Sequence, residues 1–351
     1  MFDIEDYDYN LPDELIAQVP LEDRDKSRLL VVDRSTGSMK DRHFLDLPEL
    51  LLPGDLLVVN NTRVVPARLF GRKESGGRIE ILVLEHRNEA SPKPDTRWCL
   101  LRSSKRPKKG SPLFFEKDLS GAVENLGEDG LIQITFQGPQ SIDSLLEERG
   151  MMPLPPYIRR KEKDPLSELD RERYQTVFAE RKGAVAAPTA SLHFSTELLA
   201  KLEQAGITVV HVTLHVGHGT FRPVRTRDIR NHQLGYEEYD LSPETAQAIE
   251  RSKSEGRRVV AVGTTVVRTL ESVAEKKGTL KSGRGKTDLL ITPGFPFKVV
   301  DALITNFHLP RSSLLFLVSA FAGLELIKKA YQRAIAKAYR FYSYGDAMLI
   351  L

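Results

Sequence analysis

The pattern of hydrophobic and polar residues predicts two kinds of structure along the chain. Up to about residue 65, and again beyond residue 153, apolar strand patterns alternate with helical periodicity, which is typical of an α/β fold. Between Pro66 and Met152 helical periodicity is almost absent, and about six short strand patterns are separated by turn residues. We therefore predict a larger α/β domain, residues 1–65 and 153–351, interrupted by an inserted small antiparallel β-barrel domain, residues 66–152.

The segment from Gly183 to Val224 concentrates polar residues around a predicted packed unit. Ser195 and Thr196 are N-cap candidates for a helix that Gly206 ends, and residues 207–216 alternate as a β-strand. Polar groups therefore gather at both ends of this unit, as they do where a site is built at strand ends of an α/β protein. Four of the eight histidines lie in this segment: His193, His211, His215 and His218.

The spacing of these histidines also resembles that of metal ligands. On a helix, His211 and His215 would share a face and could bind zinc. On a strand that rises about 3.3 Å per residue they stand roughly 13 Å apart, which one ion cannot span. We therefore predict no metal site and interpret His211 as a core histidine. His193 and His215 lie nearer loop ends, where substrate contact and a structural role are equally open.

Polar clusters also follow other predicted strands. Thr264 and Thr265 open a helix directly after an apolar strand, and Arg268 follows one turn along. Such a helix N-terminus could bind an anion, although ordinary capping explains the same residues. The clusters comprise residues 60–63, 189–194, 215–221, 264–268, 306–310 and 344–346.

The predicted barrel carries a strongly basic loop. Residues 102–110 contain five cations in nine positions, a composition that suits contact with a phosphate backbone but also occurs in solvated loops. Two arginines after the proline-rich turn at 152–157 add to this charge. The candidate RNA-binding residues are Arg102, Lys105, Arg106, Lys108, Lys109, Arg159 and Arg160.

Overall composition narrows the class of protein. The 51 basic and 48 acidic residues give a net charge of +3, which does not by itself indicate a nucleic-acid partner. The single cysteine, Cys99, excludes an internal disulfide and fits a reducing compartment. The N-terminus lacks the pattern of a secretory signal, and the apolar segment 314–326 is shorter than the ~20 residues that span a membrane. We expect a cytoplasmic protein with no membrane partner.

The amino-acid sequences of the polar clusters say more about the protein's family than their hydrophobic pattern does. Eight motifs between Tyr7 and Leu349 together resemble, in order, the S-adenosylmethionine:tRNA ribosyltransferase-isomerase family of queuosine biosynthesis. They are VVNNTRVVPARLFGRK, MPLPPYI, RYQTVF, GAVAAPTASLHF, VTLHVGHGTFRPV, VGTTVVRTLES, PGFPFKVVDALITNFHLPRSSLLFLVSAFAG and YRFYSYGDAML.

This resemblance implies an α/β domain interrupted by a β-barrel, a monomer, and no metal or resident cofactor. It implies a reaction in which S-adenosylmethionine, a consumed substrate, donates its ribosyl unit to the 7-aminomethyl group of a 7-deazaguanine in the tRNA anticodon. The products are epoxyqueuosine-tRNA, adenine and methionine.

That chemistry needs a base for the carbon beside the sulfonium, an acid for adenine, and a cation or helix N-terminus for the methionine carboxylate. Histidine suits proton transfer, and we predict His193 and His215 for it, with His308 as a third candidate. The predicted substrate-binding residues are Asn60, Thr62, Arg63, Thr189, Gly217, Gly219, Thr220, Thr264, Thr265, Arg268, Asp301, Asn306 and Asp346.

At three positions the sequence differs from the residues that are usual in this family. Ser191 and His218 stand where Gly and Ala are usual, so His218 is not a catalytic candidate, and Gly235 stands where a second His is frequent.

Two rival functions remain. A methyltransferase using the same donor is disfavoured because the chain lacks a strand-loop-helix in which an acidic residue is followed by GxG. A non-catalytic RNA-binding module is disfavoured by the His, Asn and Thr residues at strand ends.

Overall fold

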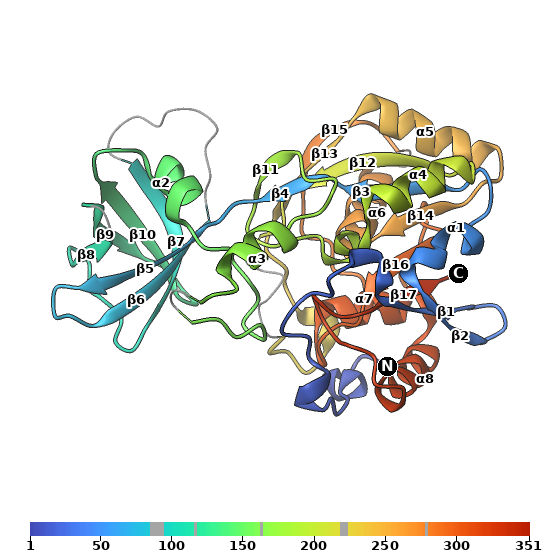
Figure 1. The fold of residues 1–351 in the computed structure, drawn as a ribbon, viewed down its shortest axis with the longest axis horizontal. Helices are drawn as coiled ribbons and strands as arrows, with labels where there is room; N and C mark the ends of the chain where they lie inside the picture. The colour runs from blue at the N-terminus through green and yellow to red at the C-terminus, as the bar shows by residue number, and fades with distance from the viewer. Residues whose placement is uncertain (85–94, 116–117, 162–163, 218–223, 278–279) are drawn as a thin grey trace.

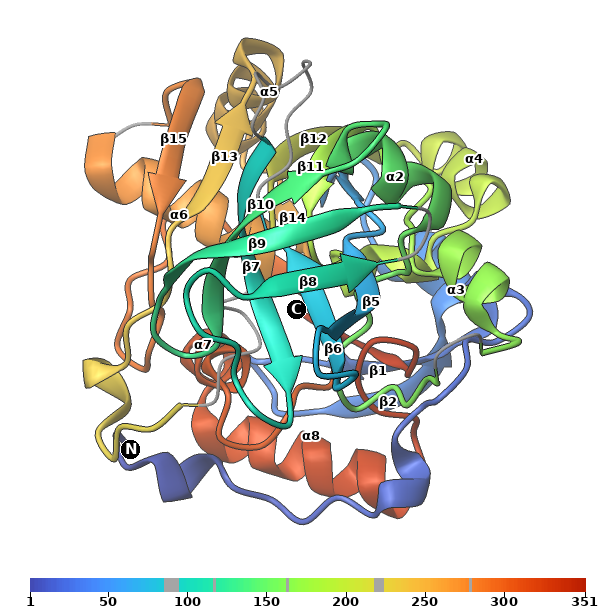
Figure 2. The same cartoon turned by 90° about the vertical axis from the view of Figure 1, so that its left-hand side faces the viewer.

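The computed structural model describes residues 1–84, 95–115, 118–161, 164–217, 224–277 and 280–351. A helix-flanked sheet and a strand barrel lie side by side, joined by a narrow connection (Figure 1). Seen from the barrel end, the barrel strands stand in front of the sheet (Figure 2). The predicted fold class, α/β with an antiparallel barrel inserted in the chain, is confirmed. The domain boundaries at residues 65/66 and 152/153 stay a prediction.

The larger body is built on a nine-stranded sheet in the order β15-β13-β12-β3-β14-β16-β17-β1-β2. Strands β12, β3, β14 and β16 pair in parallel, so their carboxyl ends lie at one edge of the sheet. Strands β3, β14 and β16 are buried at every position, as expected for parallel strands covered on both faces. The strands are β1 (Arg28–Val32), β2 (Met39–His43), β3 (Leu56–Asn60), β12 (Thr208–Leu214), β13 (Glu237–Leu241), β14 (Val259–Val262), β15 (Gly283–Thr287), β16 (Ala302–Asn306) and β17 (Ala347–Ile350).

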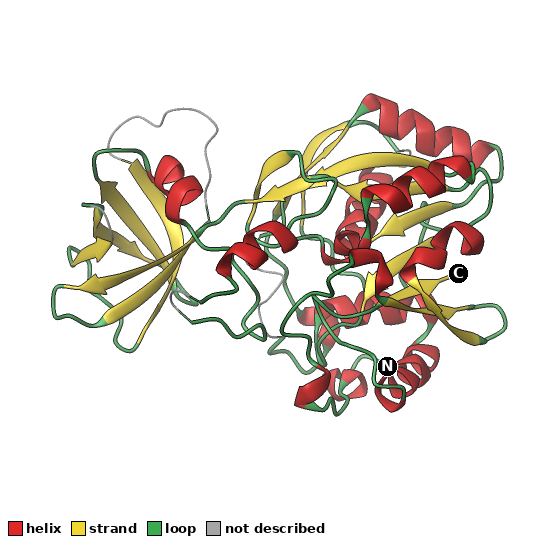
Figure 3. Ribbon diagram, in the orientation of Figure 1, coloured by secondary structure: helices red, strands yellow, loops and turns green. Residues whose placement is uncertain are grey.

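Helices cover both faces of this sheet (Figure 3). In β3, Leu56 and Val58 join the core beneath α5 to α8, whereas Leu57 and Val59 join the core beneath α1 and α4, because alternate side chains of a strand point to opposite faces. Ser195 accepts a hydrogen bond from the backbone of the third residue after it, which confirms the predicted N-cap of α4. The helices are α1 (Leu47–Leu50), α4 (Thr196–Gln204), α5 (Pro243–Ser254), α6 (Thr264–Lys277), α7 (Ser313–Ala322) and α8 (Leu324–Ala336).

The barrel is closed, with the order β10-β7-β6-β5-β8-β9 and antiparallel pairing throughout. Its core contains buried Cys99 and is closed at one end by apolar residues of α2 (Ile142–Arg149). The barrel strands are β5 (Arg68–Lys73), β6 (Arg78–Val83), β7 (Asp95–Ser103), β8 (Pro112–Phe115), β9 (Ser120–Leu126) and β10 (Leu131–Gln137).

Two backbone pairings flank the passage of the chain between the larger body and the barrel, one within each. The chain leaves through β4 (Thr62–Val64), which pairs in parallel with β11 (Arg181–Ala184) after the chain has returned through α3 (Ser167–Arg173). Arg68 and Met151, at the entrance and exit of the barrel, form an antiparallel bridge with both backbone hydrogen bonds present. Of the helices in the described part of the chain, none is long and apolar enough to cross a membrane.

Candidate active site

A pocket of about 310 Å³ opens beyond the carboxyl ends of β14 and β16. Its lining comes from the first turn of α6, the short helix at 189–193, the residues that follow β16 and the proline-rich turn. Two tyrosines on its wall, Tyr157 and Tyr342, have ring centroids 4.7 Å apart. A largely apolar cavity with a few polar groups at strand ends is typical of a small-molecule site. It is lined by five predicted site residues, Thr189, Thr264, Thr265, Asn306 and His308.

Asn306 presents an unsatisfied acceptor at this pocket. Its Nδ2 lies 3.1 Å from the backbone oxygen of Tyr342 and 3.1 Å from Nε2 of His193. Because the carbonyl oxygen can only accept, the nitrogen of the amide must face it, and Oδ1 is left as an acceptor. This Oδ1 is buried and has no hydrogen-bond partner among the described residues. A substrate N–H or O–H could satisfy it.

His193 supports Asn306 from behind the pocket. Since its Nε2 accepts from the Asn306 amide, its proton is on Nδ1, which lies 2.7 Å from Oγ of Ser27 and donates to it. Burial, together with the positive charges of Arg340 and Arg24, lowers the pKa of His193 to about 3, so the ring is neutral at pH 7. Both ring nitrogens are occupied and neither lines the pocket. This geometry disfavours the predicted proton transfer by His193 and favours a positioning role.

His308 is the one predicted catalytic histidine that lines the pocket. Its Nε2 lies 2.8 Å from Oγ1 of Thr305, and its backbone N–H donates to the hydroxyl of Tyr331. Its backbone carbonyl accepts a hydrogen bond from the hydroxyl of Tyr9. Burial lowers the pKa of His308 to about 3, so this ring too is neutral at pH 7.

His215 lies elsewhere, in a groove on the outer strands of the sheet. Its Nδ1 is 2.8 Å from Oγ1 of Thr62, and its ring packs against the backbone of Gly183. Neither Thr62 nor His215 lines the 310 Å³ pocket, and Arg63 points to solvent on β4. The structure therefore does not bring His215 and Thr62 into one pocket with Asn306, because β12 leads to the side of the sheet that faces β4 and β11; their roles at a site stay a prediction.

Asn60 also serves the fold. Its Oδ1 accepts from the backbone N–H groups of Thr62 and Leu214, and its Nδ2 donates to the backbone oxygen of Leu214. Nδ2 is also 3.4 Å from Oγ1 of Thr265, at the edge of hydrogen-bonding distance. Asn60 therefore braces β3 against β12 and contacts the pocket only through Thr265.

His211 is exposed rather than in the core, because it lies at the edge of its sheet face, beside the ring of Phe178.

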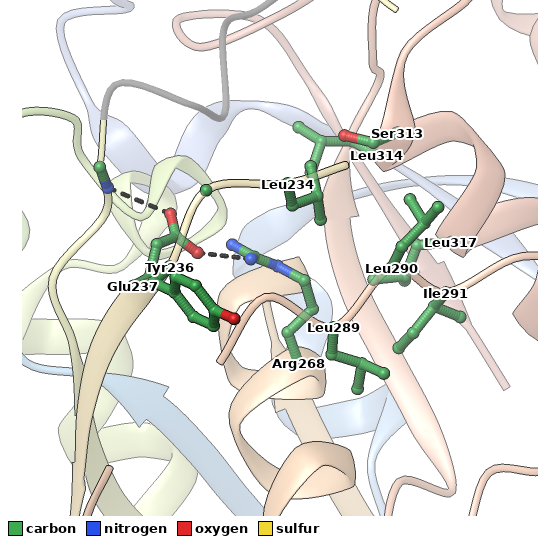
Figure 4. A pocket seen from close by; sticks show the side chains of 12 residues that line it. Leu234, Tyr236, Glu237, Arg268, Leu289, Leu290, Ile291, Ser313, Leu314 and Leu317 are labelled. Carbon is green, nitrogen blue, oxygen red and sulfur yellow. Dashed lines mark hydrogen bonds and ion pairs between the residues drawn. The ribbon is translucent and has the colours of Figure 1, made fainter. Parts of the chain in front are cut away.

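Arg268 is occupied by a buried ion pair in a second, smaller pocket (Figure 4). Its guanidinium pairs with Glu237, and the two side chains are 5% and 4% exposed. Glu237 also accepts from the backbone N–H of Gly217 at 3.1 Å. Figure 4 shows the guanidinium facing the carboxylate, with leucines around it. Because Glu237 neutralises Arg268, the structure disfavours its predicted role, together with Thr264 and Thr265, in binding the methionine carboxylate.

Two predicted substrate-binding carboxylates have structural roles instead. Asp301 precedes β16, at the end of that strand opposite Asn306, where it accepts from the backbone of Val259 and pairs with Lys253 at 2.7 Å. Asp346 is buried and accepts from two backbone N–H groups, at 2.9 and 2.8 Å. Neither of them lines the pocket, so the structure does not support their assignment to it. The predicted residues Gly219 and Thr220, and His218, lie outside the described residues.

Some of the predicted RNA-binding cations already interact with groups of the protein itself, and others are exposed. Arg160 forms a buried ion pair with Asp170 at 2.6 Å, which disfavours its predicted contact with RNA. The guanidinium of Arg106 donates to two backbone carbonyls of the barrel. Arg159 is exposed and lies 3.6 Å from Asp13. Exposed side chains remain at Arg102, Lys105, Lys108 and Lys109.

Sequence analysis did not single out Ser27, Tyr157 or Tyr342. Both tyrosines stand within quoted family motifs, so the wording of those motifs could have identified them. Ser27 had no such indication, because its role depends on a contact with a residue 166 positions away. Within the described ranges, no group of three or more His, Cys, Asp or Glu residues could hold a metal ion.

The fold and the pocket together define an α/β enzyme with an appended β-barrel. The chain belongs to the family described as "Queuosine biosynthesis protein", which matches residues 4–350, and the resemblance predicted from the motifs is thereby confirmed. It is 51% identical over 350 residues to the S-adenosylmethionine:tRNA ribosyltransferase-isomerase of Trichlorobacter lovleyi, with 99% of both chains covered. The protein of the same name from Carboxydothermus hydrogenoformans is 50% identical over 351 residues, again with 99% of each chain covered.

A solved structure that is similar to this chain belongs to a protein with the same family name. The crystal structure of S-adenosylmethionine tRNA ribosyltransferase from Thermotoga maritima matches with 41% identity and a TM-score of 0.56. The match covers 99% of this chain and 100% of the other. The relatives thus agree with the predicted fold along the whole chain.

Proposed function

We propose that this protein is an S-adenosylmethionine:tRNA ribosyltransferase-isomerase. It transfers and isomerises the ribosyl unit of S-adenosylmethionine onto the 7-aminomethyl group of a 7-deazaguanine in tRNA, giving epoxyqueuosine-tRNA and releasing adenine and methionine. The observation that carries the proposal is the 51% identity over 99% of both chains to a protein of this name. S-adenosylmethionine is consumed as a substrate, and the proposal includes no metal or resident cofactor and a monomeric, cytoplasmic protein.

The 310 Å³ pocket supports this function by its chemistry. Thr264 and Thr265 lie in the first turn of α6, where free backbone N–H groups and the helix dipole favour the methionine carboxylate. The Tyr157 and Tyr342 rings offer planar apolar surface to a purine-like base. Oδ1 of Asn306 accepts from an exocyclic amino group or a ribose hydroxyl.

His308 is the histidine we retain for proton transfer. It lines the pocket, and because its pKa is lowered to about 3 its ring is neutral and has a lone pair at pH 7. Base strength falls with pKa, so burial makes His308 a weak base. A bound anionic carboxylate nearby would raise that pKa by favouring the charged ring.

The test is to incubate the protein with S-adenosylmethionine and tRNA carrying the aminomethyl-deazaguanine. Equal release of adenine and methionine, with a ribosyl-sized mass gain on the nucleoside, is the expected result. S-adenosylhomocysteine would instead identify a methyltransferase. Binding of tRNA without consumption of the donor would identify a non-catalytic RNA-binding module.

A further inference from the structure

Three neighbouring barrel strands present cations and one aromatic ring on a shared outward face. Along the pairings of β5, β6 and β7, Arg72 stands opposite Arg78, Phe70 opposite Glu80, and Glu80 opposite Arg102. Since alternate residues of a strand point the same way, these five side chains share one side of the sheet, and the residues between them fill the barrel core. We call this surface the basic barrel face.

The basic barrel face is concave and carries a net positive charge. It lines a groove of about 750 Å³, to which Lys161 adds a fourth cation from the segment that follows the barrel. The one carboxylate in the groove, Glu80, is already paired with Arg68 at 3.2 Å. Arg78, Arg102 and Lys161 are exposed and form no ion pair with any residue that the structure describes. Their charge is therefore available to an anionic partner.

The half-buried ring of Phe70 makes RNA a better match than an acidic protein. Arginines and lysines neutralise phosphates, and an aromatic ring among them can stack an unpaired base. An acidic peptide would use the cations but would leave the ring without a planar partner.

The groove is connected to the catalytic pocket by a short segment of chain. Tyr157 lines the 310 Å³ pocket, and Lys161, four positions later, lines the barrel groove. The segment lies between the barrel and the sheet body, which stand side by side (Figure 1). One RNA molecule can therefore contact both surfaces at once.

From these observations we infer that the basic barrel face binds the phosphate backbone of the tRNA substrate and stacks one of its unpaired bases on Phe70. The inference rests on the proposed function, since that function supplies the tRNA. It assigns to the three-strand face the RNA contact that the sequence suggested for the loop at 102–110, of which Arg102 belongs to both surfaces.

The test measures the dissociation constant of tRNA as a function of salt concentration. Removing two cations, in Arg78→Ala with Arg102→Ala, should reduce the slope of log affinity against log salt by about 0.7–0.9 per charge. Phe70→Ala should weaken binding roughly 5- to 150-fold and leave the slope unchanged. The matched control is Arg42→Ala, which removes an exposed arginine from β2 of the sheet body.

Unchanged affinity and slope in the double arginine variant would overturn the inference, as would equal losses in Arg42→Ala. Phe70→Ala with wild-type affinity, or displacement of tRNA by polyglutamate at equal charge concentration, would exclude base stacking and point to an acidic protein partner. Wild-type turnover is measured separately. If the wild-type protein binds tRNA through this face but releases no adenine, the proposed function is refuted and the inferred RNA-binding role of the face is upheld. If the wild-type protein is active and the variants keep both KM for tRNA and kcat, only the inferred role of the face is refuted.

Discussion

At the scale of single residues, the chain from Ser27 through His193 to Asn306 explains how one amide is oriented at the pocket. Each member fixes the next: the serine accepts from the histidine, the histidine accepts from the amide, and the amide oxygen is left to accept. A neutral, buried histidine is a firm acceptor because it does not titrate near neutral pH. In the function proposed above, Asn306 is the member of this chain that would contact the substrate.

Asn306→Ala should reduce kcat/KM for S-adenosylmethionine roughly 5- to 150-fold, which corresponds to a loss of about 1–3 kcal/mol in transition-state stabilisation. The reason is that a buried donor of the substrate loses its partner. His193→Gln should cost less, since a glutamine amide can still hold Asn306. Steady-state kinetics between pH 5 and 9 would check both variants. A His193→Gln enzyme that loses the acidic limb of the pH profile would show that His193 is a catalytic base and not a positioning residue.

The two buried histidines also predict how stability depends on pH. His193 and His308 have folded pKa values of about 3, below the value of about 6.5 expected in the unfolded chain. Between those values the unfolded state binds more protons, so the free energy of unfolding falls as pH is lowered from about 6.5 towards 3. Each histidine adds a slope of at most about 1.4 kcal/mol per pH unit. Urea unfolding at several pH values should show a shallower slope in His308→Gln, and an unchanged slope would contradict the assignment.

At the scale of elements, the β4–β11 pair determines where His215 lies. Gly183 on β11 has a φ of +148°, and a Cβ there would lie 2.8 Å from the ring of His215. The close approach of backbone and ring lets Thr62 on β4 reach the same imidazole at 2.8 Å. A connection between two domains is thus packed against a side chain of the main sheet.

Gly183→Ala should lower the free energy of unfolding by about 1–3 kcal/mol, because the added methyl group meets the His215 ring and the backbone favours glycine. Gly235→Ala is the matched control, as nothing lies within 4 Å of its Cβ position. Thermal unfolding of the two variants would test this. Equal melting temperatures would mean that His215 moves aside at no cost.

Elements were predictable where the pattern is local, and contacts were not. The helix after Ser195 and the strand near 207–216 follow from a cap, a period and a glycine, and both are present. The burial of Arg160 depends on Asp170, and that of Arg268 on Glu237, which no local pattern reveals. Sequence therefore placed polar residues at the right strand ends but could not tell which of them face the same cavity.

At the scale of the whole molecule, the barrel is a self-contained insertion. Its apolar core draws only on residues 69–146 and shares none with the three other apolar clusters of the described residues. The bridge between Arg68 and Met151 brings the two ends of the insertion together. Each body can thus keep its own core when the other is altered.

Replacing residues 69–150 by an Asn-Gly turn between Arg68 and Met151 should leave a folded sheet domain, since the antiparallel bridge has the geometry that such a turn closes. We expect one cooperative unfolding transition and thermal stabilisation by S-adenosylmethionine, with loss of tRNA affinity. Circular dichroism and calorimetry would measure the first two. An aggregated product would show that the sheet domain depends on the barrel.

The sheet order also has a consequence in time. Strand β3 pairs with β12 and β14, and roughly 150 residues separate the end of β3 from the start of β12. At about 5–20 residues per second, a translating ribosome needs roughly 7–30 seconds to make that stretch. During this interval the nascent chain carries β3, of which four of five residues are apolar, with no partner strand, while the barrel, made within the same interval, is already able to fold. We therefore expect synthesis of this protein to pass through a state in which the barrel can fold before the sheet that positions the 310 Å³ pocket has been made.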